Sequence, residues 1–297
     1  MTAGAESAPE VARVRDRARA GRRRAARAAA IAARHESLAA GGSEALRSLH
    51  EKIAAMHRQI ERRHREAAAM HSEYADRLAA WFRRPVQRER RPVFMASVAR
   101  TLGSHSAAIM LLSADLDEIL AAASDGLARQ AQDLEFAFRE GPARDAAIGR
   151  ILVTADDGAF SDRWTHYGPA LAQLGVHAVA AVPLQLSEGA FGALTAFSTG
   201  PADDLDLTTL GTVADTLAHA ILAAPEPAAF EQDLPRVGVF EDGDVRPVVH
   251  QAAGMLCVQA HCTIADALAL IRARAFADEE PVEATAGRIL SGVLHLA

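Results

Sequence analysis

The feature that most constrains this fold is a heptad pattern across residues 43–82, a segment without glycine or proline. Helix-forming residues dominate the segment. Apolar side chains recur every seven residues, and a second apolar row follows three residues behind. The first row is Leu46, Ile53, Ile60, Ala67, Tyr74 and Trp81, and the second is Leu49, Met56 and Met70, with Arg63 and Arg77 as polar exceptions. Two such rows form the a/d seam of a coiled coil. We therefore predict a long helix over residues 36–84 that pairs in a homodimer, with packing against the chain's own domain as the alternative.

A row of histidines follows the same seven-residue period on the flank of this seam: His50, His57, His64 and His71. Neighbours in this row lie about 10.5 Å apart on one helix, which is too far for two of them to share a metal ion. Histidine titrates near neutral pH, so a pH-sensing role is one interpretation. The favoured interpretation is a solvated flank of the seam.

The charge is strongly asymmetric along the chain. Residues 1–100 hold 22 of the 32 Lys and Arg but 11 of the 38 Asp and Glu, so the remainder is strongly acidic. Much of the positive charge lies between Arg13 and Arg34, within a basic arm over residues 1–35. Such an arm can attract nucleic acid by counterion release. A frayed, solvated arm is the interpretation that we favour slightly.

The bulk composition excludes several classes of protein. A chain of 297 residues suits about two ordinary domains. No window approaches the roughly 18 consecutive apolar residues of a membrane span, and the N-terminus has no apolar secretion signal. Only Cys257 and Cys262 occur, so no disulfide framework is expected. We expect a cytoplasmic protein without a membrane partner.

The middle of the chain predicts mixed strands and helices. Pro85 and Pro92 end the long helix, and a short helical pattern runs from Pro92 to Gly103. The pattern then predicts strands at 107–112, 116–123, 176–186 and 190–199, the last two joined by a turn at Ser187-Glu188-Gly189. Residues 205–224 read as a helix capped by Asp204 or Asp206. This arrangement predicts an α+β sheet with packed helices.

Residues 90–224 contain a Gly-Pro-x-x-Asp-Ala turn, an Arg-Trp helix, a Gly-Val strand, a Pro-Leu pair and a Gly-x-Leu strand. These motifs are formed by Gly141, Pro142, Asp145, Ala146, Arg163, Trp164, Gly175, Val176, Pro183, Leu184, Gly192 and Leu194. With these motifs, the segment resembles the GAF domains that accompany ANTAR domains in actinobacteria. Ala143 departs from the pattern, in which cysteine is usual. The resemblance implies an α+β sensor domain that encloses a small-molecule pocket or serves as a dimer scaffold.

Within this domain, Arg163, Trp164 and Tyr167 are the candidates to line a pocket for an unidentified small molecule. Helix-to-sheet packing or an ion pair is the better interpretation of all three. With both cysteines elsewhere, bilin attachment and thiolate haem ligation here are excluded, and we expect no cofactor. No metal-ligand spacing and no catalytic constellation appear, so we expect no metal site and no enzyme. Cys257, His261 and Cys262 are close in sequence, but inert thiols are the interpretation that we favour over a metal site.

The C-terminal residues predict three short helices after a Pro-rich, acidic linker over 225–245. Apolar spacing predicts the first helix at 248–259. Thr263 and Asp266 form a capping box that opens a second helix at 264–276. The third follows Pro281 and runs to Leu296.

Residues 246–297 resemble an ANTAR domain, a three-helix module of bacterial transcription antiterminators. The matching residues are Ala252, Gly254, Leu256, Thr263, Ala267, Arg272, Ala275, Ala286 and Ile289. The resemblance implies that the module binds twin RNA hairpins as a dimer and prevents a terminator from forming. Arg272, Arg274 and Arg288 are then the candidate RNA contacts, with Gln251 as a base reader. The sequence departs from the family at Ala253, where the family has lysine, and at the acidic Asp278-Glu279-Glu280. In the alternative interpretation, without RNA binding, Arg272 and Arg274 form ion pairs with Asp266 and Glu280 on the helix surfaces.

The sequence therefore predicts an α+β chain: a long N-terminal helix, a GAF-like sheet with packed helices and a three-helix ANTAR-like module. The predicted function is signal-responsive transcription antitermination through RNA hairpins. The alternative is a small-molecule or protein-interaction sensor whose C-terminal module no longer binds RNA.

Overall fold

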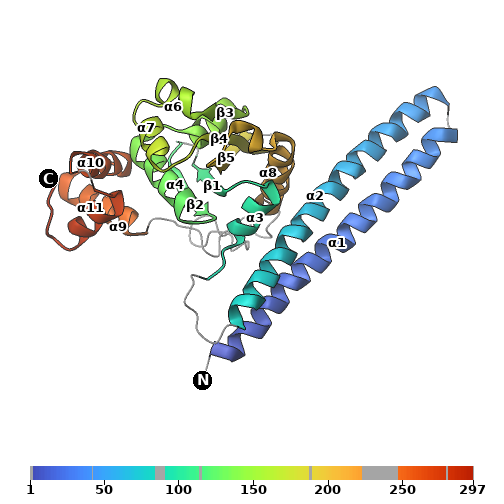
Figure 1. The fold of residues 1–297 in the computed structure, drawn as a ribbon, viewed down its shortest axis with the longest axis horizontal. Helices are drawn as coiled ribbons and strands as arrows, with labels where there is room; N and C mark the ends of the chain where they lie inside the picture. The colour runs from blue at the N-terminus through green and yellow to red at the C-terminus, as the bar shows by residue number, and fades with distance from the viewer. Residues whose placement is uncertain are drawn as a thin grey trace. The chain divides into compact units, whose positions relative to one another are not determined.

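The computed structural model describes residues 3–41, 43–83, 91–113, 116–186, 189–222, 247–278 and 280–296 (Figure 1). The predicted linker over 225–245, Pro85 and the Ser187-Glu188 turn lie outside these residues. The chain divides into two compact units. One comprises Met1–Gly103 and Asp206–Glu241, and the other comprises Ser104–Leu205 and Asp242–Ala297.

The first unit begins with a hairpin of two long helices, α1 (Ala3–Gly41) and α2 (Glu44–Phe82). Residues 3–35 are helical, so the frayed, solvated arm that we slightly favoured for residues 1–35 is wrong for them, and the predicted 36–84 helix is divided between α1 and α2. Small side chains explain the pairing, because they recur at heptad spacing on the buried face of α1. This buried row consists of Val11, Val14, Ala18, Ala25, Ala28, Ala32 and Ala39. A Cβ placed on Gly21 would lie 3.0 Å from the Cβ of Ala68 on α2, so the two helices approach closely.

The histidine row of α2 lies along α1 and does not form the solvated flank that we predicted. His50 Nδ1 lies 2.9 Å from His35 Nδ1 of α1. Burial lowers the pKa of His64, and Arg24 of α1 lowers it further. Burial also lowers the pKa of His71 to about 4, with Arg17 of α1 adding to the effect. The ring of His71 packs against Phe94, with 5.0 Å between ring centroids.

The predicted a/d seam of α2 is shared between two environments. Met70 and Tyr74 are buried within the unit, and Tyr74 meets the ring of Phe94 edge-on. In contrast, Leu46, Leu49 and Met56 are each 51% exposed, so the N-terminal half of the seam is only partly covered by the described residues.

We expect the hairpin to loosen in acid because of His71. The folded-state pKa of about 4 lies below the ordinary value of 6.5, so folding disfavours the protonated ring. The stabilisation is complete above pH 6.5 and is lost as the pH falls from 6.5 toward 4. The loss is at most about 3 kcal/mol, because the ring is only partly shielded from water.

Circular dichroism of thermal unfolding between pH 4.5 and 7.5 tests this prediction. A His71→Leu variant keeps the apolar contact with Phe94 and should show a weaker pH dependence over this interval. The control is His105→Leu, which changes a histidine outside α2. Equal acid sensitivity of the wild type and the His71→Leu variant would contradict the assignment.

Two shorter helices complete the first unit, α3 (Phe94–Leu102) and α8 (Leu207–Leu222). Both match the predicted segments. The carboxylate of Asp206 accepts hydrogen bonds from the backbone N–H groups of Thr208 and Thr209 at 3.0 and 3.1 Å. It is therefore the cap of α8, one of the two residues predicted for this role. Arg63 of α2 donates to Asp215 of α8 at 3.1 Å.

The second unit contains a five-stranded antiparallel sheet with the order β2-β1-β5-β4-β3. Its strands are β1 (Ser106–Leu112), β2 (Glu118–Ala123), β3 (Val153–Asp156), β4 (Ala178–Leu186) and β5 (Gly189–Ser198). Four of them confirm predicted strands, and β1 pairs with β2. Gly192 of β5 allows a close approach, since a Cβ there would lie 2.2 Å from the carbonyl oxygen of Met110 on β1.

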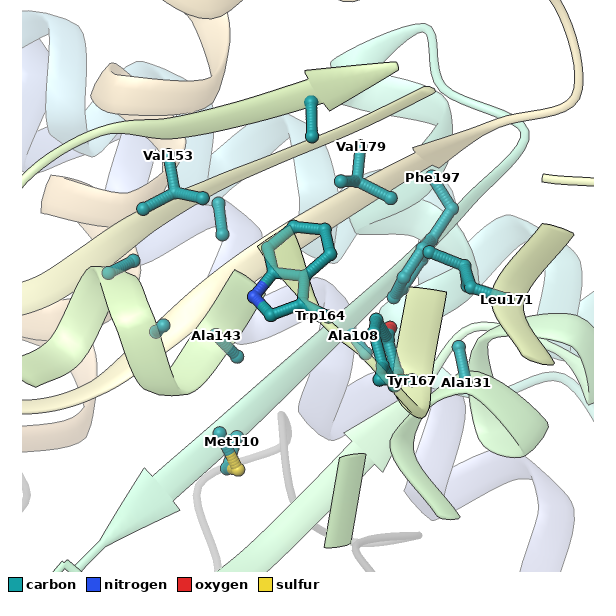
Figure 2. Packing of buried hydrophobic residues seen from close by; sticks show 14 of the residues in the cluster. Ala108, Met110, Ala131, Ala143, Val153, Trp164, Tyr167, Leu171, Val179 and Phe197 are labelled. Carbon is teal, nitrogen blue, oxygen red and sulfur yellow. The ribbon is translucent and has the colours of Figure 1, made fainter. Parts of the chain in front are cut away.

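Helices α4 (Gly126–Phe138), α5 (Pro142–Gly149), α6 (Asp157–Arg163) and α7 (Tyr167–Gln173) pack with this sheet. A short 3-10 turn, η1 (Ala202–Asp204), follows β5. The sheet and these helices enclose an apolar core around Trp164 and Tyr167 (Figure 2). The fold class is α+β, as predicted.

The same unit ends in α9 (Pro247–Ala260), α10 (Ile264–Ala277) and α11 (Val282–Leu290). The Thr263–Asp266 capping box is present at the start of α10 and confirms the prediction. The third helix is shorter than predicted, since it ends at Leu290 instead of Leu296. Buried aliphatic side chains of the three helices form a second core, which also contains Phe136 of α4.

Within the described residues, no single helix is long and apolar enough to cross a membrane. Val248–Ala260 and Ile264–Ala277 pass such a test only as a pair bent by 109°.

Candidate functional site

The three residues predicted to line a ligand pocket lie on or next to α6 and α7. Trp164 and Tyr167 are almost completely buried, and Figure 2 shows them among side chains from β1, β3, β4, β5, α4 and α5. Their rings meet edge-on with 5.7 Å between centroids. Arg163 is the exposed member of the group. Its guanidinium carbon lies 5.4 Å from the centre of the Trp164 ring.

Asp145 of α5 connects these residues. Its Oδ2 accepts a hydrogen bond from the indole Nε1 of Trp164 at 3.1 Å, and Arg163 Nε lies 3.3 Å from the same oxygen. Arg163 also donates to the carbonyl oxygen of Thr154 on β3 at 3.2 Å. The Asp of the Gly-Pro-x-x-Asp-Ala turn therefore orients the tryptophan, and Arg163, Trp164 and Tyr167 all make packing or ion-pair contacts.

Gly141, the glycine of the same turn, stands at a position where a larger residue would not fit. Gly141 has φ +155°, and a Cβ on it would lie 2.6 Å from Cδ of Glu135. This space holds the Glu135 carboxyl group, whose Oε1 accepts the backbone N–H of Arg144 at 2.8 Å. Ala143, at the position where the resembled family has cysteine, is completely buried in the core.

Sequence reasoning missed a group of buried polar side chains on α4. Glu135 is fully buried, and burial raises its pKa to about 8. Gln132, one helical turn earlier, is 1% exposed, and both polar atoms of its amide lack a partner among the described residues. The buried hydroxyl of Tyr167 also lacks one there, and burial, with a contribution from Glu135, raises the pKa of this phenol.

Buried polar atoms are nearly always hydrogen-bonded, to protein or to an enclosed molecule. Gln132, Glu135 and Tyr167 therefore stand out as buried side chains of this core with polar atoms that lack a partner among the described residues. The only signal in the sequence was the three-residue spacing of Gln132 and Glu135 on one helix face, which is too common to be diagnostic.

The four residues predicted to contact RNA lie on the C-terminal helices. Gln251 is exposed on α9. Arg274 of α10 donates to Asp278 at 2.8 Å. Arg288 of α11 donates to Asp278 at 3.0 Å and to Glu280 at 2.8 Å. The structure thus brings two of the arginines to a shared carboxylate.

Arg272 is placed differently from the other two arginines. Only 8% of it is exposed, and its guanidinium carbon lies 5.4 Å from the ring centre of Phe136 on α4. Burial, together with the positive charge of nearby Arg139, lowers its pKa to about 10. The group remains protonated at neutral pH. Neither Asp266 nor Glu280, the partners considered from sequence, forms a recorded ion pair with Arg272.

A cavity of about 490 Å³ lies along the line where α4 meets α10 and the start of α11. Its lining is mainly apolar and includes Leu134, Phe138, Leu174, Phe276 and Val282. The rings of Phe138 and Phe276 meet edge-on at 6.0 Å. The contact between α4 and α10 is therefore incompletely filled.

Cys257 and Cys262 are both free and partly buried. Burial raises the pKa of the Cys257 thiol, and Cys262 raises it further. Across the described residues, no group of three or more His, Cys, Asp or Glu side chains is placed to hold a metal ion.

Comparisons with known proteins support part of the expected organisation. The family model of the GAF domain matches residues 92–221. No ANTAR domain is identified. No curated protein matches the chain. Among solved structures, the chain is similar to the GAF domain region of a Geobacter sulfurreducens PCA protein, with 17% identity and a TM-score of 0.35. The match covers 43% of this chain and 88% of that one. Residues 92–221 of this protein form a GAF domain.

Proposed function

We propose that the chain is a cytoplasmic, signal-responsive transcription antitermination regulator. In this proposal the GAF domain senses a small molecule, and the C-terminal helices α9–α11 bind twin RNA hairpins. The chain acts as a homodimer and not as an enzyme. The half-exposed row of Leu46, Leu49 and Met56 on α2 supports self-association, because it keeps the heptad spacing of a coiled-coil seam.

The observation that carries the regulatory part is the contribution of Phe136 to the core of the C-terminal helices. Phe136 belongs to α4, the GAF helix that also carries Gln132 and Glu135. A molecule that changes the position of α4 would therefore act directly on α10. Such a signal must have different affinities for two states of the protein, and the α4–α10 contact is the element that can differ between them.

RNA binding is supported by the resemblance of residues 246–297 to ANTAR domains and by the chemistry of the candidate side chains. Unpaired RNA bases stack on planar groups, and a guanidinium binds phosphate through two parallel hydrogen bonds. Arg274 and Arg288 now bind Asp278 and Glu280, so phosphate oxygens would replace carboxylate oxygens as their acceptors.

One observation favours a second function, a sensor whose C-terminal helices do not bind RNA. Asp278 and Glu280 neutralise Arg274 and Arg288 within the protein. RNA-binding modules usually present a basic patch. In this second proposal the GAF domain would signal to a protein partner.

A gel-shift assay with a twin-hairpin leader RNA separates the two proposals. The antitermination proposal expects the full chain to bind with an affinity that falls as salt rises. It also expects Arg274→Ala combined with Arg288→Ala to weaken binding by roughly tenfold or more, because two phosphate contacts are lost. Arg47→Ala, which removes an exposed arginine on α2, is the matched control. Absent or salt-independent binding would support the sensor proposal instead.

A further inference from the structure

The environment of Arg272 is supplied largely by the GAF domain. The ring of Phe136 covers its guanidinium, and Phe136 is itself only 5% exposed. The charged groups that act on Arg272 are Arg139, Asp117, Arg144 and Glu118. All four lie on α5, β2 or the loops that adjoin α4 and β2, and Arg139 and Asp117 are paired at 2.7 Å. The most enclosed of the candidate RNA contacts is therefore held by a different domain.

The chemistry of the contact between Phe136 and Arg272 determines which group could take the place of Phe136. A planar guanidinium stacks on an aromatic face through its π system and its charge. An unpaired nucleobase offers the same kind of flat face. Phe136 and an RNA base would therefore compete for one side of Arg272.

The α4–α10 contact is also limited in extent. Phe136 and the Phe138–Phe276 ring pair are its aromatic contacts, and a cavity of about 490 Å³ lies beside them. Phe276 remains 61% exposed although it takes part in the contact. Incomplete packing lowers the attraction between two surfaces. Separation of α10 from α4 would break the Phe138–Phe276 ring contact and expose Phe136.

We propose that α4 holds the C-terminal helices in a docked, autoinhibited state in which Phe136 occupies the RNA-contact face of Arg272. RNA binding then requires α10 to leave α4. This inference rests on the proposed antitermination function for the identity of the ligand. The docking itself is tested without RNA.

The first experiment measures the reactivity of Arg272 toward phenylglyoxal, which modifies accessible arginines. Peptide mass spectrometry follows the full chain, with the exposed Arg47 as internal reference. In the wild type we expect Arg272 to react about tenfold more slowly than Arg47, since it must first leave Phe136. Phe136→Ala should remove most of this difference. Equal rates for the two arginines in the wild type would overturn the proposal.

A second pair of variants tests the proposal even if Phe136→Ala does not fold. Phe276→Ala truncates a largely exposed ring that contacts Phe138, so it weakens docking and leaves both cores intact. Val258→Ala truncates an apolar side chain on α9 that is 76% exposed. We expect Phe276→Ala to accelerate the modification of Arg272 and Val258→Ala to leave it unchanged. No acceleration in Phe276→Ala, or equal acceleration in both, would overturn the proposal.

The gel shift with twin-hairpin RNA then assigns the ligand. Phe276→Ala should bind about tenfold more tightly than the wild type, and Val258→Ala should match the wild type. Unchanged RNA affinity in a variant with accelerated Arg272 modification would overturn the autoinhibition of RNA binding. RNA that binds no variant would overturn the antitermination function, while the modification rates would still establish that docking shields Arg272.

Discussion

Replacement of Trp164 by alanine is expected to lower the free energy of unfolding of the sheet-containing unit by about 3–5 kcal/mol. The indole is 1% exposed and lies in the centre of the core between the sheet and its helices. Its removal leaves a cavity and also deprives Asp145 of the Nε1–H donor. Urea unfolding followed by circular dichroism measures the loss.

Two controls separate packing from ligand binding at this position. Trp164→Phe keeps most of the apolar volume and should cost less than Trp164→Ala. Arg163→Ala removes an exposed side chain and should change stability by less than about 1 kcal/mol. If Trp164→Ala folds with wild-type stability, the tryptophan is not a core residue, and its interpretation as a ligand contact becomes the better one.

Glu135 is expected to make the same unit less stable as the pH rises from about 4.5 to 8. Burial raises the pKa of its carboxyl group to about 8, and Glu118 of β2 and Asp145 of α5 add to the rise. The backbone N–H and the charge of Arg144 oppose it. The folded state therefore binds a proton that the unfolded chain releases above its ordinary pKa of 4.5. The stabilisation is fully present below pH 4.5 and is lost by about pH 8.

The expected loss over this interval is at most about 5 kcal/mol. A Glu135→Gln variant keeps an oxygen acceptor for the N–H of Arg144 and cannot ionise. Its stability should depend less on pH, and it should exceed the wild type most clearly near pH 8. Urea unfolding at pH 5, 6.5 and 8 compares the two proteins. Parallel pH profiles would show that Glu135 is ionised in the folded state.

The pattern of apolar residues predicted the strands and helices in which apolar side chains recur regularly. It failed where the buried side chains are small or polar. Residues 1–35 read as a solvated arm because alanine and arginine dominate them. The buried row on α1 consists mostly of alanines, which count little in an apolar pattern but allow two helices to approach closely. Helix α4 was missed because it buries Gln132 and Glu135, and β3 was missed because it has only four residues.

The candidate site was predictable only in part. The Gly-Pro-x-x-Asp-Ala turn and Arg-Trp pair marked residues that the fold brings together through Asp145. The contact between Phe136 and Arg272 joins residues distant in the chain, and no local pattern encodes it. The same holds for Asp278, whose carboxylate binds two arginines from different helices.

In the hairpin of α1 and α2, helix α2 carries two separate sets of side chains. His64, Ala68 and His71 of α2 lie against α1, whereas Leu46, Leu49 and Met56 are each 51% exposed. Protonation of His71 disturbs the closed hairpin, while the three apolar side chains stay accessible on its surface. Substitution of Leu46, Leu49 or Met56 can therefore change the apolar surface of α2 without altering the acid sensitivity of the hairpin.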